Sequence, residues 1–205
     1  MNDLSGTKEL IFDTFLQLTG AYGYENVGVR AIAKKVGINP ASIYHYFTGK
    51  KTMLKYAYDY YEEHRNQKGR PSDKMNDLLK KASAQEIVGL FACPPAAKDK
   101  KEYERMVLIT KIIYMRMIQD PIANRLFAEN KTDSLQFISS VLKQGMDIGR
   151  IDPNFDGETF AYVLIGSLED MEIDAFSGAV EAEALPEREK RILAMLARLL
   201  ATGLK

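Results

Sequence analysis

Residues 24–54 limit the possible folds of this chain more than any other segment, because they predict two short helices joined by a tight turn, followed by a third helix. Gly37 follows the first short helix, and glycine ends a helix there because it enters the left-handed region without a steric penalty. Asn39 and Pro40 then form an N-cap followed by proline at the first helical position. This arrangement is typical of a helix-turn-helix, whose second helix, here residues 40–47, enters the DNA major groove.

The second short helix is expected to have a packed side and an outer side. Ile43 and Phe47 are four residues apart and share a face, which suits packing against the first short helix. Ala41, Ser42 and His45 fall on the outer face. They are small or polar, so we expect them to approach base edges in the groove.

Basic charge dominates this segment. No Asp or Glu occurs between Asn26 and Tyr58, so a polyanion can lie against it without meeting a fixed negative charge. Tyrosine hydroxyls and lysine ammonium groups at a groove edge are good phosphate ligands, and we assign this role to Tyr44, Tyr46 and Lys50. For Tyr44, core packing fits the sequence equally well. The basic residues are Arg30, Lys34, Lys35, Lys50, Lys51 and Lys55.

The segment resembles the N-terminal DNA-binding domain of the TetR family of bacterial transcriptional regulators. The resemblance implies an all-α fold of about nine helices. Residues 1–50 would form a three-helix helix-turn-helix domain, and residues 51–205 a helical effector-binding and dimerisation domain whose first helix, residues 51–65, connects the two. The matching positions are Ile11, Phe15, Leu18, Gly23, Tyr24, Ile32, Ala33, Gly37, Ile38, Ser42, Ile43, Tyr44, Tyr46, Phe47, Lys50 and Leu54.

Three positions depart from the family pattern. Gly28 stands where the family often has Thr or Ser, whose hydroxyl caps the first short helix and contacts a phosphate. Asn39 stands where Ser is common, and Lys51 stands where an acidic residue is common. The DNA-binding residues predicted from the pattern and the resemblance together are Gly28, Arg30, Asn39, Ala41, Ser42, Tyr44, His45, Tyr46 and Lys50.

The formal net charge of the chain is zero, but the charge is unevenly distributed. Residues 1–70 carry 10 Lys or Arg against 7 Asp or Glu, whereas residues 71–205 carry 18 against 21. This predicts a basic N-terminal part, called the head below, and a mildly acidic remainder, called the body. The chain shows no signal-peptide pattern and no run of about 18 apolar residues, so we expect a soluble cytoplasmic protein with no membrane partner. The single cysteine, Cys93, is interpreted as an ordinary thiol.

Beyond residue 50 the sequence predicts helices with short joints. A capping box formed by Ser83 and Glu86 predicts a break in the second of these helices, and residues 67–71 predict the joint between head and body. The predicted helices cover residues 51–65, 72–90, 99–119, 121–149, 154–176 and 186 onward.

Two apolar stripes near the end of the chain have two possible explanations. Apolar side chains recur at helical spacing in residues 160–171 and again in residues 192–200. They fit the core of one chain, or the four-helix dimer interface that the family resemblance implies. For the dimer, the predicted interface residues are Ala161, Leu164, Ile165, Leu168, Ile192, Leu196, Leu199 and Leu200.

Residues 99–119 are apolar on nearly every side, which predicts a helix buried all round. Such a helix fits plain core or the lining of an effector cavity, and the resemblance favours a cavity because many family members are released from DNA by small molecules. Flexible methionines suit a pocket that adapts to its ligand. The candidate lining residues are Met106, Thr110, Ile113, Tyr114 and Met117.

An acidic segment, residues 152–187, contains ten Asp or Glu and no Lys or Arg. Four of its acids crowd the end of a predicted helix, where negative charge opposes the helix dipole. Either they pair with basic residues of the last helix, such as Arg188, or they form a site for a cationic ligand. The four acids are Glu169, Asp170, Glu172 and Asp174.

The predicted function is that of a homodimeric transcriptional repressor, which binds a palindromic DNA operator and leaves it when a small-molecule effector binds. An enzyme is disfavoured, because the chain has two histidines, one cysteine and neither a nucleophile elbow nor a glycine-rich phosphate loop. For the same reason we expect no cofactor and no metal. A protein-binding regulator that lacks DNA binding is a third possibility, against which the basic segment argues.

Overall fold

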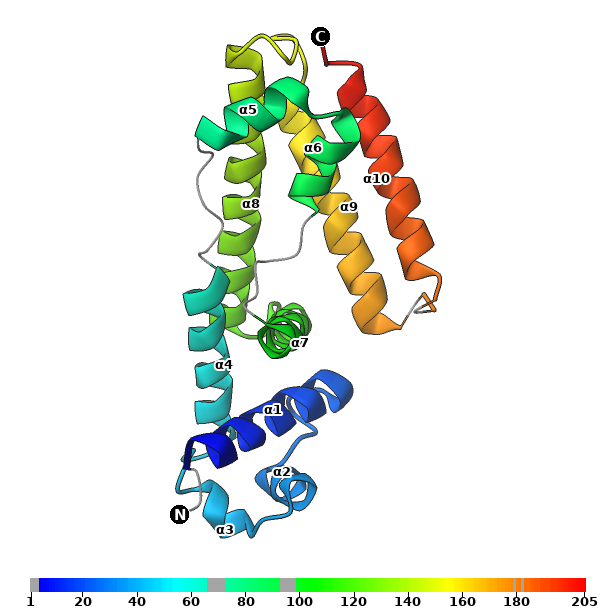
Figure 1. Cartoon of the computed structure of the whole chain (residues 1–205). Coiled ribbons are helices and arrows are strands. Elements are labelled where there is room, and N and C mark those ends of the chain that lie inside the picture. The colour runs from blue at the N-terminus through cyan, green and yellow to red at the C-terminus, as the bar shows by residue number, and fades with distance from the viewer. Residues whose placement is uncertain (1–3, 66–72, 93–98, 179, 182) are drawn as a thin grey trace. The chain divides into compact units, whose positions relative to one another are not determined.

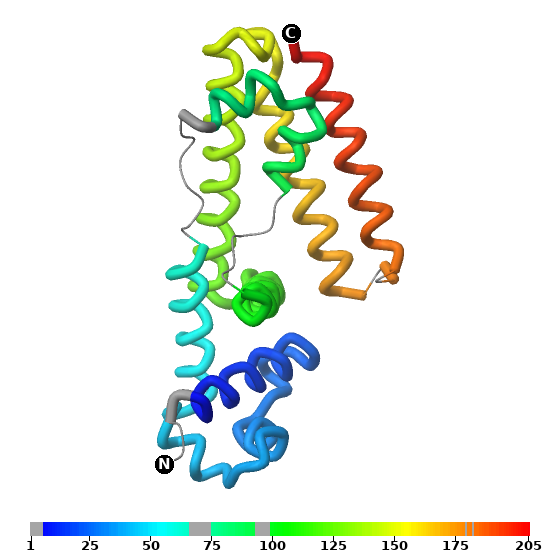
Figure 2. Tube along the Cα trace, viewed as in Figure 1, coloured from blue at the N-terminus to red at the C-terminus, as the bar shows by residue number. Residues whose placement is uncertain are grey.

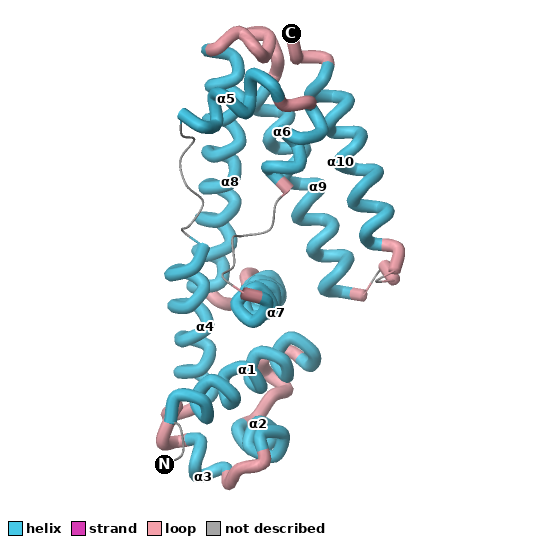
Figure 3. Tube along the Cα trace, viewed as in Figure 1, coloured by secondary structure: helices cyan, strands magenta, loops and turns pink. Residues whose placement is uncertain are grey.

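The computed structural model describes residues 4–65, 73–92, 99–178, 180–181 and 183–205. Within these ranges it contains ten α-helices, and its extended pairing is limited to an isolated bridge between Ile151 and Leu204 (Figures 1 and 3). The predicted all-α fold is confirmed, with one helix more than the nine or so expected.

The helices can be followed from blue to red along the trace (Figure 2). They are α1 (Leu4–Tyr22), α2 (Val29–Val36), α3 (Pro40–Ile43), α4 (Lys50–Arg65), α5 (Asp73–Lys81), α6 (Ala84–Phe91), α7 (Lys100–Arg116), α8 (Pro121–Asp147), α9 (Gly157–Ser177) and α10 (Leu185–Ala201). The chain divides into two compact units, and one of the boundaries between them falls within α8. Unit 1 comprises Met1–Gln67 with Pro95–Ala128, and unit 2 comprises Lys68–Pro94 with Glu129–Lys205.

Side-chain caps fix where several helices begin. The predicted capping box is present: the Ser83 backbone N–H donates to Glu86 Oε2 over 2.7 Å, and the Glu86 N–H donates to Ser83 Oγ over 3.3 Å. The break between α5 and α6 is therefore confirmed. Asp99 caps α7 and Asp156 caps α9, each by accepting a backbone N–H three residues ahead, at 2.8 Å and 3.0 Å.

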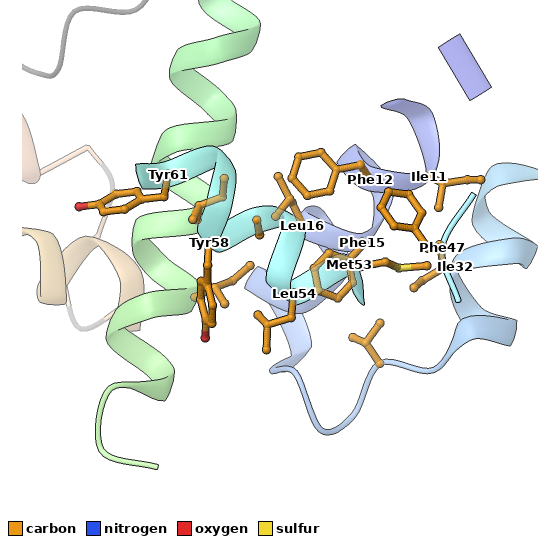
Figure 4. Close-up of a cluster of buried hydrophobic side chains, with 14 of the residues drawn as sticks. Ile11, Phe12, Phe15, Leu16, Ile32, Phe47, Met53, Leu54, Tyr58 and Tyr61 are labelled. Atoms are coloured by element: carbon orange, nitrogen blue, oxygen red, sulfur yellow. The ribbon is translucent and has the colours of Figure 1, made fainter. Parts of the chain in front are cut away.

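The core of unit 1 forms where α1 packs against α2 and α7 and the side chains of α4 complete the cluster. Phe15 of α1 is fully buried, and Figure 4 shows it beside Met53 of α4, with Ile32 of α2 close by. The prediction that residues 99–119 form a helix buried all round is wrong. Met115 of α7 is 49% exposed, and Ile118, which follows the end of α7, is 89% exposed.

The core of unit 2 joins α6, α8, α9 and α10. The residues between α8 and α9 hold the segment that follows α10. Ile151 bridges to Leu204, and the Asp152 N–H donates to the Gly203 carbonyl over 2.7 Å. Arg150 Nη2 also donates to the Ala82 carbonyl over 3.2 Å, which ties this junction to the end of α5.

Two predicted features, the joint at residues 67–71 and Cys93, lie outside the described residues. Among the described helices, none combines the length and the apolar character needed to cross a bilayer.

Candidate nucleic-acid interface

The first helix of the motif, α2, begins and ends at glycines. Gly28 is the N-cap in an extended conformation (φ −107°, ψ 158°), and no side chain caps the helix there. Gly37 at the other end has φ 81°, and its N–H donates to the Ala33 carbonyl over 2.9 Å. Because this left-handed conformation strains other residues, Gly37 fixes the sharp turn into α3, as predicted.

The second helix of the motif, α3, begins as predicted but is shorter. Asn39 Oδ1 accepts the Ala41 N–H over 2.9 Å, and Pro40 occupies the first turn. The helix ends at Ile43 rather than near Phe47, because the following N–H groups of Tyr44, His45 and Tyr46 donate to carbonyls three residues back and form a tighter turn.

Residues 40–47 have the predicted packed side, and the predicted outer side is exposed except at Ser42. Ile43 and Phe47 are 0% and 2% exposed and belong to the same core cluster as the buried residues of α2. Ala41 and His45 are exposed, whereas Ser42 is half-buried. The outer side therefore presents short or polar groups without exposing the core.

The three candidate phosphate ligands differ in exposure. Tyr44 is 56% exposed, so core packing, the alternative explanation, does not hold for this residue. Tyr46 is half-buried and packs against the core cluster. Lys50 is half-buried as well, and its ammonium donates to the Tyr24 carbonyl over 2.7 Å and lies 4.0 Å from the centroid of the Tyr24 ring.

The other basic residues of this segment point to solvent. Lys55 has an acidic neighbour in α4, since its ammonium lies 2.6 Å from Asp59 Oδ2. Arg30, Lys34, Lys35 and Lys51 are exposed. An exposed cluster of basic side chains of this kind attracts a polyanion and releases counterions when one binds.

One further basic residue, Lys8, is not among the DNA-binding residues predicted from the sequence. Its ammonium lies 4.7 Å from the Tyr56 ring centroid and 5.5 Å from the Phe47 ring centroid, so it joins the basic surface beside α4. The two contacts join residues 39 and 48 positions apart in the sequence, and no local pattern indicates them.

Gly28 gives a matched test of the turn chemistry. Gly28→Ser is expected to raise the free energy of unfolding by a few tenths to ~1 kcal/mol, because a Cβ at this position meets nothing within 4 Å and the hydroxyl can cap α2. Gly37→Ser is the control. It should lower the free energy of unfolding by about 1–2 kcal/mol, because serine would have to adopt the positive φ of Gly37. Thermal and urea unfolding measure both. A shift of the same sign in the two variants would contradict this account.

The residues predicted for a dimer interface lie largely inside unit 2. Leu168 and Ile192 are half-buried. Of the eight predicted interface residues, only Leu199 is exposed, at 44%. The fully buried members of the set are Ala161, Leu164, Ile165, Leu196 and Leu200.

The residues predicted to line a pocket belong to α7 and its end in unit 1. Met106 and Ile113 are buried in the core of that unit, and Thr110, Tyr114 and Met117 are half-buried. The ring of Tyr114 packs edge-on against Phe127 of α8, with 5.2 Å between centroids. Two open hollows, of about 440 and 450 Å³, lie instead in unit 2, and none of these five residues borders them.

The acidic cluster at the end of α9 has basic partners within the chain. Arg188 binds Asp174 and lies 3.8 Å from Asp170, so pairing with the last helix is confirmed for these two acids. Glu169 pairs with Lys131 of α8 over 2.7 Å, a partner that the sequence did not indicate. In the part of the chain that the structure describes, no three His, Cys, Asp or Glu residues gather to form a metal site.

The helix-turn-helix motif matches a known protein family. Residues 11–57 match the family model described as "Bacterial regulatory proteins, tetR family". No curated protein sequence matches the chain significantly.

Several solved structures have a similar fold over nearly the whole chain. A TetR-family transcriptional regulator from Mesorhizobium loti covers 100% of both chains at 17% identity, with a TM-score of 0.56. A transcriptional regulator from Saccharomonospora viridis in complex with choline covers 98% of both chains at 17% identity, with a TM-score of 0.63. The SmeT–triclosan complex, also 17% identical, covers 98% of this chain and 92% of that chain, with a TM-score of 0.56. At such identities the likeness establishes the fold.

Proposed function

Because the chain belongs to the TetR family of bacterial transcriptional regulators, we propose that it is a homodimeric repressor that a small-molecule ligand releases from its operator. The observation that carries this proposal is the outer side of α3 and of the turn after it. Ala41 and His45 are exposed there, within a basic segment that has no Asp or Glu from residue 26 to residue 58. We propose that this regulator acts in the cytoplasm, without catalytic activity, cofactor or metal.

In this mechanism the helix-turn-helix binds the major groove with α3. Ala41, Ser42 and His45 approach base edges, while Tyr44, Tyr46, Lys50 and Arg30 hold phosphates. Gly28 and Asn39, at the N-termini of α2 and α3, bring backbone N–H groups toward the phosphates. Two copies of the head would read a palindromic operator whose half-sites lie about 34–36 Å apart or at a multiple of that distance.

We propose residues 1–50 as the DNA-binding domain and residues 51–205 as the effector-binding and dimerisation domain, connected by the helix over residues 51–65. The dimer would form through α9 and α10, which pack against each other within the chain. Their exposed apolar side chains, Tyr162, Val163, Met195 and Leu199, suit the partner-facing side, since they would otherwise meet water.

The effector would bind in the body of the protein. Two regulators with this fold are described in complex with choline and with triclosan, which supports a small-molecule site here. We assign its lining to Met106, Thr110, Ile113, Tyr114 and Met117. The ligand releases DNA only if it binds one arrangement of the heads better than the other.

A selection experiment tests the DNA-binding part of the proposal. Purified full-length protein is incubated with a random double-stranded DNA pool at stated salt, and the bound DNA is sequenced. Enrichment of a two-fold symmetric site supports the dimeric repressor, and the half-site spacing gives the head-to-head distance. Enrichment of no sequence, with binding that disappears at moderate salt, would overturn it and favour the protein-binding alternative.

Substitutions of the phosphate ligands should weaken binding to all sequences alike. Tyr46→Phe removes one hydroxyl and Lys50→Ala one charge, and Lys50→Ala is expected to lower affinity roughly tenfold and to reduce the salt slope by about 1. Affinities for the selected site and for unrelated DNA, measured over a salt series, check this. A variant that changed sequence preference at unaltered affinity would show that the residue reads bases instead.

A further inference from the structure

Tyr24 lies between the DNA-binding motif and α7 in unit 1, and two cations contact its ring. Besides the Lys50 ammonium, the guanidinium of Arg116 lies 4.2 Å from the ring centroid. The ring is half-buried and packs against the core cluster, and burial raises the pKa of its hydroxyl. Tyr24 is therefore a fixed aromatic surface, and an aromatic face attracts a cation more strongly when water is excluded.

Arg116, at the end of α7, is held by acids on two sides. Its Nη1 donates to Glu25 Oε1 over 3.1 Å, and its Nε donates to Asp120 Oδ2 over 3.2 Å. The Arg116 side chain is 16% exposed and that of Asp120 is 13% exposed, so the Arg116–Asp120 pair is largely shielded from solvent. The planar guanidinium can donate to both acids while it lies against the ring, which a lysine ammonium does less well.

Asp120 connects Arg116 to two further helices. Its Oδ1 accepts the Ile122 N–H over 3.0 Å at the start of α8, and its Oδ2 accepts the Tyr58 hydroxyl of α4 over 3.1 Å. Burial alone would raise the pKa of Asp120, but these hydrogen bonds and Arg116 outweigh burial and lower it. The side chain is thus held as a carboxylate, and Arg116 keeps a fixed partner.

From these contacts we propose that Tyr24 and Arg116 are positioning residues that hold the Lys50 ammonium ready for a DNA phosphate, so that a displacement of α7 weakens DNA binding through Lys50. An ammonium has three donors, and the Tyr24 carbonyl takes one, which leaves two for phosphate oxygens. This inference rests on the proposed function and names one route by which the body of the protein controls the DNA contact.

These contacts are expected to raise the affinity for DNA because they order the flexible Lys50 side chain before it binds. A free lysine side chain loses rotamer freedom when it binds a phosphate, whereas Lys50 has already been ordered by the ring and the carbonyl of Tyr24. Loss of the ring, or of Arg116, which fixes the ring, is expected to weaken DNA binding about three- to tenfold.

The test is a double-mutant cycle on the selected operator. Tyr24→Leu and Arg116→Gln are each measured alone and combined with Lys50→Ala, over a salt series. Each single variant should weaken binding about three- to tenfold, and neither should weaken it further once Lys50 is replaced. Tyr24→Phe keeps the ring and the carbonyl and is the matched control, with affinity close to that of the unsubstituted protein.

The outcomes separate this inference from the proposed function. Failure of the unsubstituted protein to bind any site would overturn the proposed function. If that protein binds but the losses from Tyr24→Leu and Lys50→Ala simply add, the positioning role is overturned, because a general loss of structure also weakens binding when Lys50 is absent. Should Arg116→Gln fail to fold in thermal unfolding, Arg116→Lys replaces it, since it keeps the charge but loses the planar fork.

Discussion

Replacement of Phe15 with alanine is expected to lower the free energy of unfolding by about 3–5 kcal/mol, the largest loss of stability from a single substitution that we predict. Phe15 is 0% exposed, and its ring fills the space where α1 meets α4 in the core of unit 1. Alanine leaves a cavity that the surrounding helices cannot close completely. Domains of this size have a free energy of unfolding of only about 5–15 kcal/mol, so this substitution removes a large part of the stability.

Urea unfolding followed by circular dichroism measures this change, and the melting temperature should fall by on the order of 10 °C. Tyr22→Ala is the matched control, because it also removes an aromatic ring from α1 but at a position that is 65% exposed. That control should change the free energy of unfolding by less than about 0.5 kcal/mol. A loss below about 1 kcal/mol for Phe15→Ala would contradict the packing described for unit 1.

The double substitution Met195→Glu with Leu199→Glu is expected to convert the proposed dimer to a monomer of 23.1 kDa. The two side chains are 53% and 44% exposed and lie one turn apart on α10, so carboxylates there leave the fold of the chain intact. In a dimer the same carboxylates would be buried without partners, which costs several kcal/mol. Affinity for a two-fold operator should fall by a factor of about 10² or more, since the second head no longer binds from the same molecule.

Light scattering after gel filtration gives the mass, and DNA titration gives the affinity. Lys190→Glu changes the net charge by the same amount at an exposed position near the start of α10, and it should leave both quantities unaltered. If the double variant keeps the dimeric mass, α10 does not provide the interface through these residues, and that part of the proposal fails.

The features that the sequence predicted well are those set by neighbours within a few residues. Gly37 ends α2, Asn39 caps α3, and the capping box at Ser83 separates α5 from α6, all by contacts across two to four positions. Such contacts need only backbone geometry and one side chain, so the residue types indicate them directly. The helix α3 is shorter than the sequence predicts, because no residue type marks the tighter turn after Ile43.

The sequence could not predict what covers each apolar surface. Periodicity identified the stripes in α9 and α10, but it did not show that Leu164 and Leu196 would be buried by the chain itself while Met195 would face outward. The contacts between Lys50 and Tyr24 could not be predicted either, since the two residues are 26 positions apart in the sequence. Side-chain placement of this kind depends on the assembled fold rather than on local pattern.

The exposed positions of α3 also suggest how a protein of this kind can come to bind a new operator sequence. In α3 only Ile43 is buried, whereas Ala41 and, in the turn that follows, His45 are exposed and contribute little to the core. Changes at these positions should therefore alter which operator is chosen at little cost in stability. Gene duplication followed by drift at these few codons would give related regulators with separate operators, and a laboratory library confined to them would search the same space.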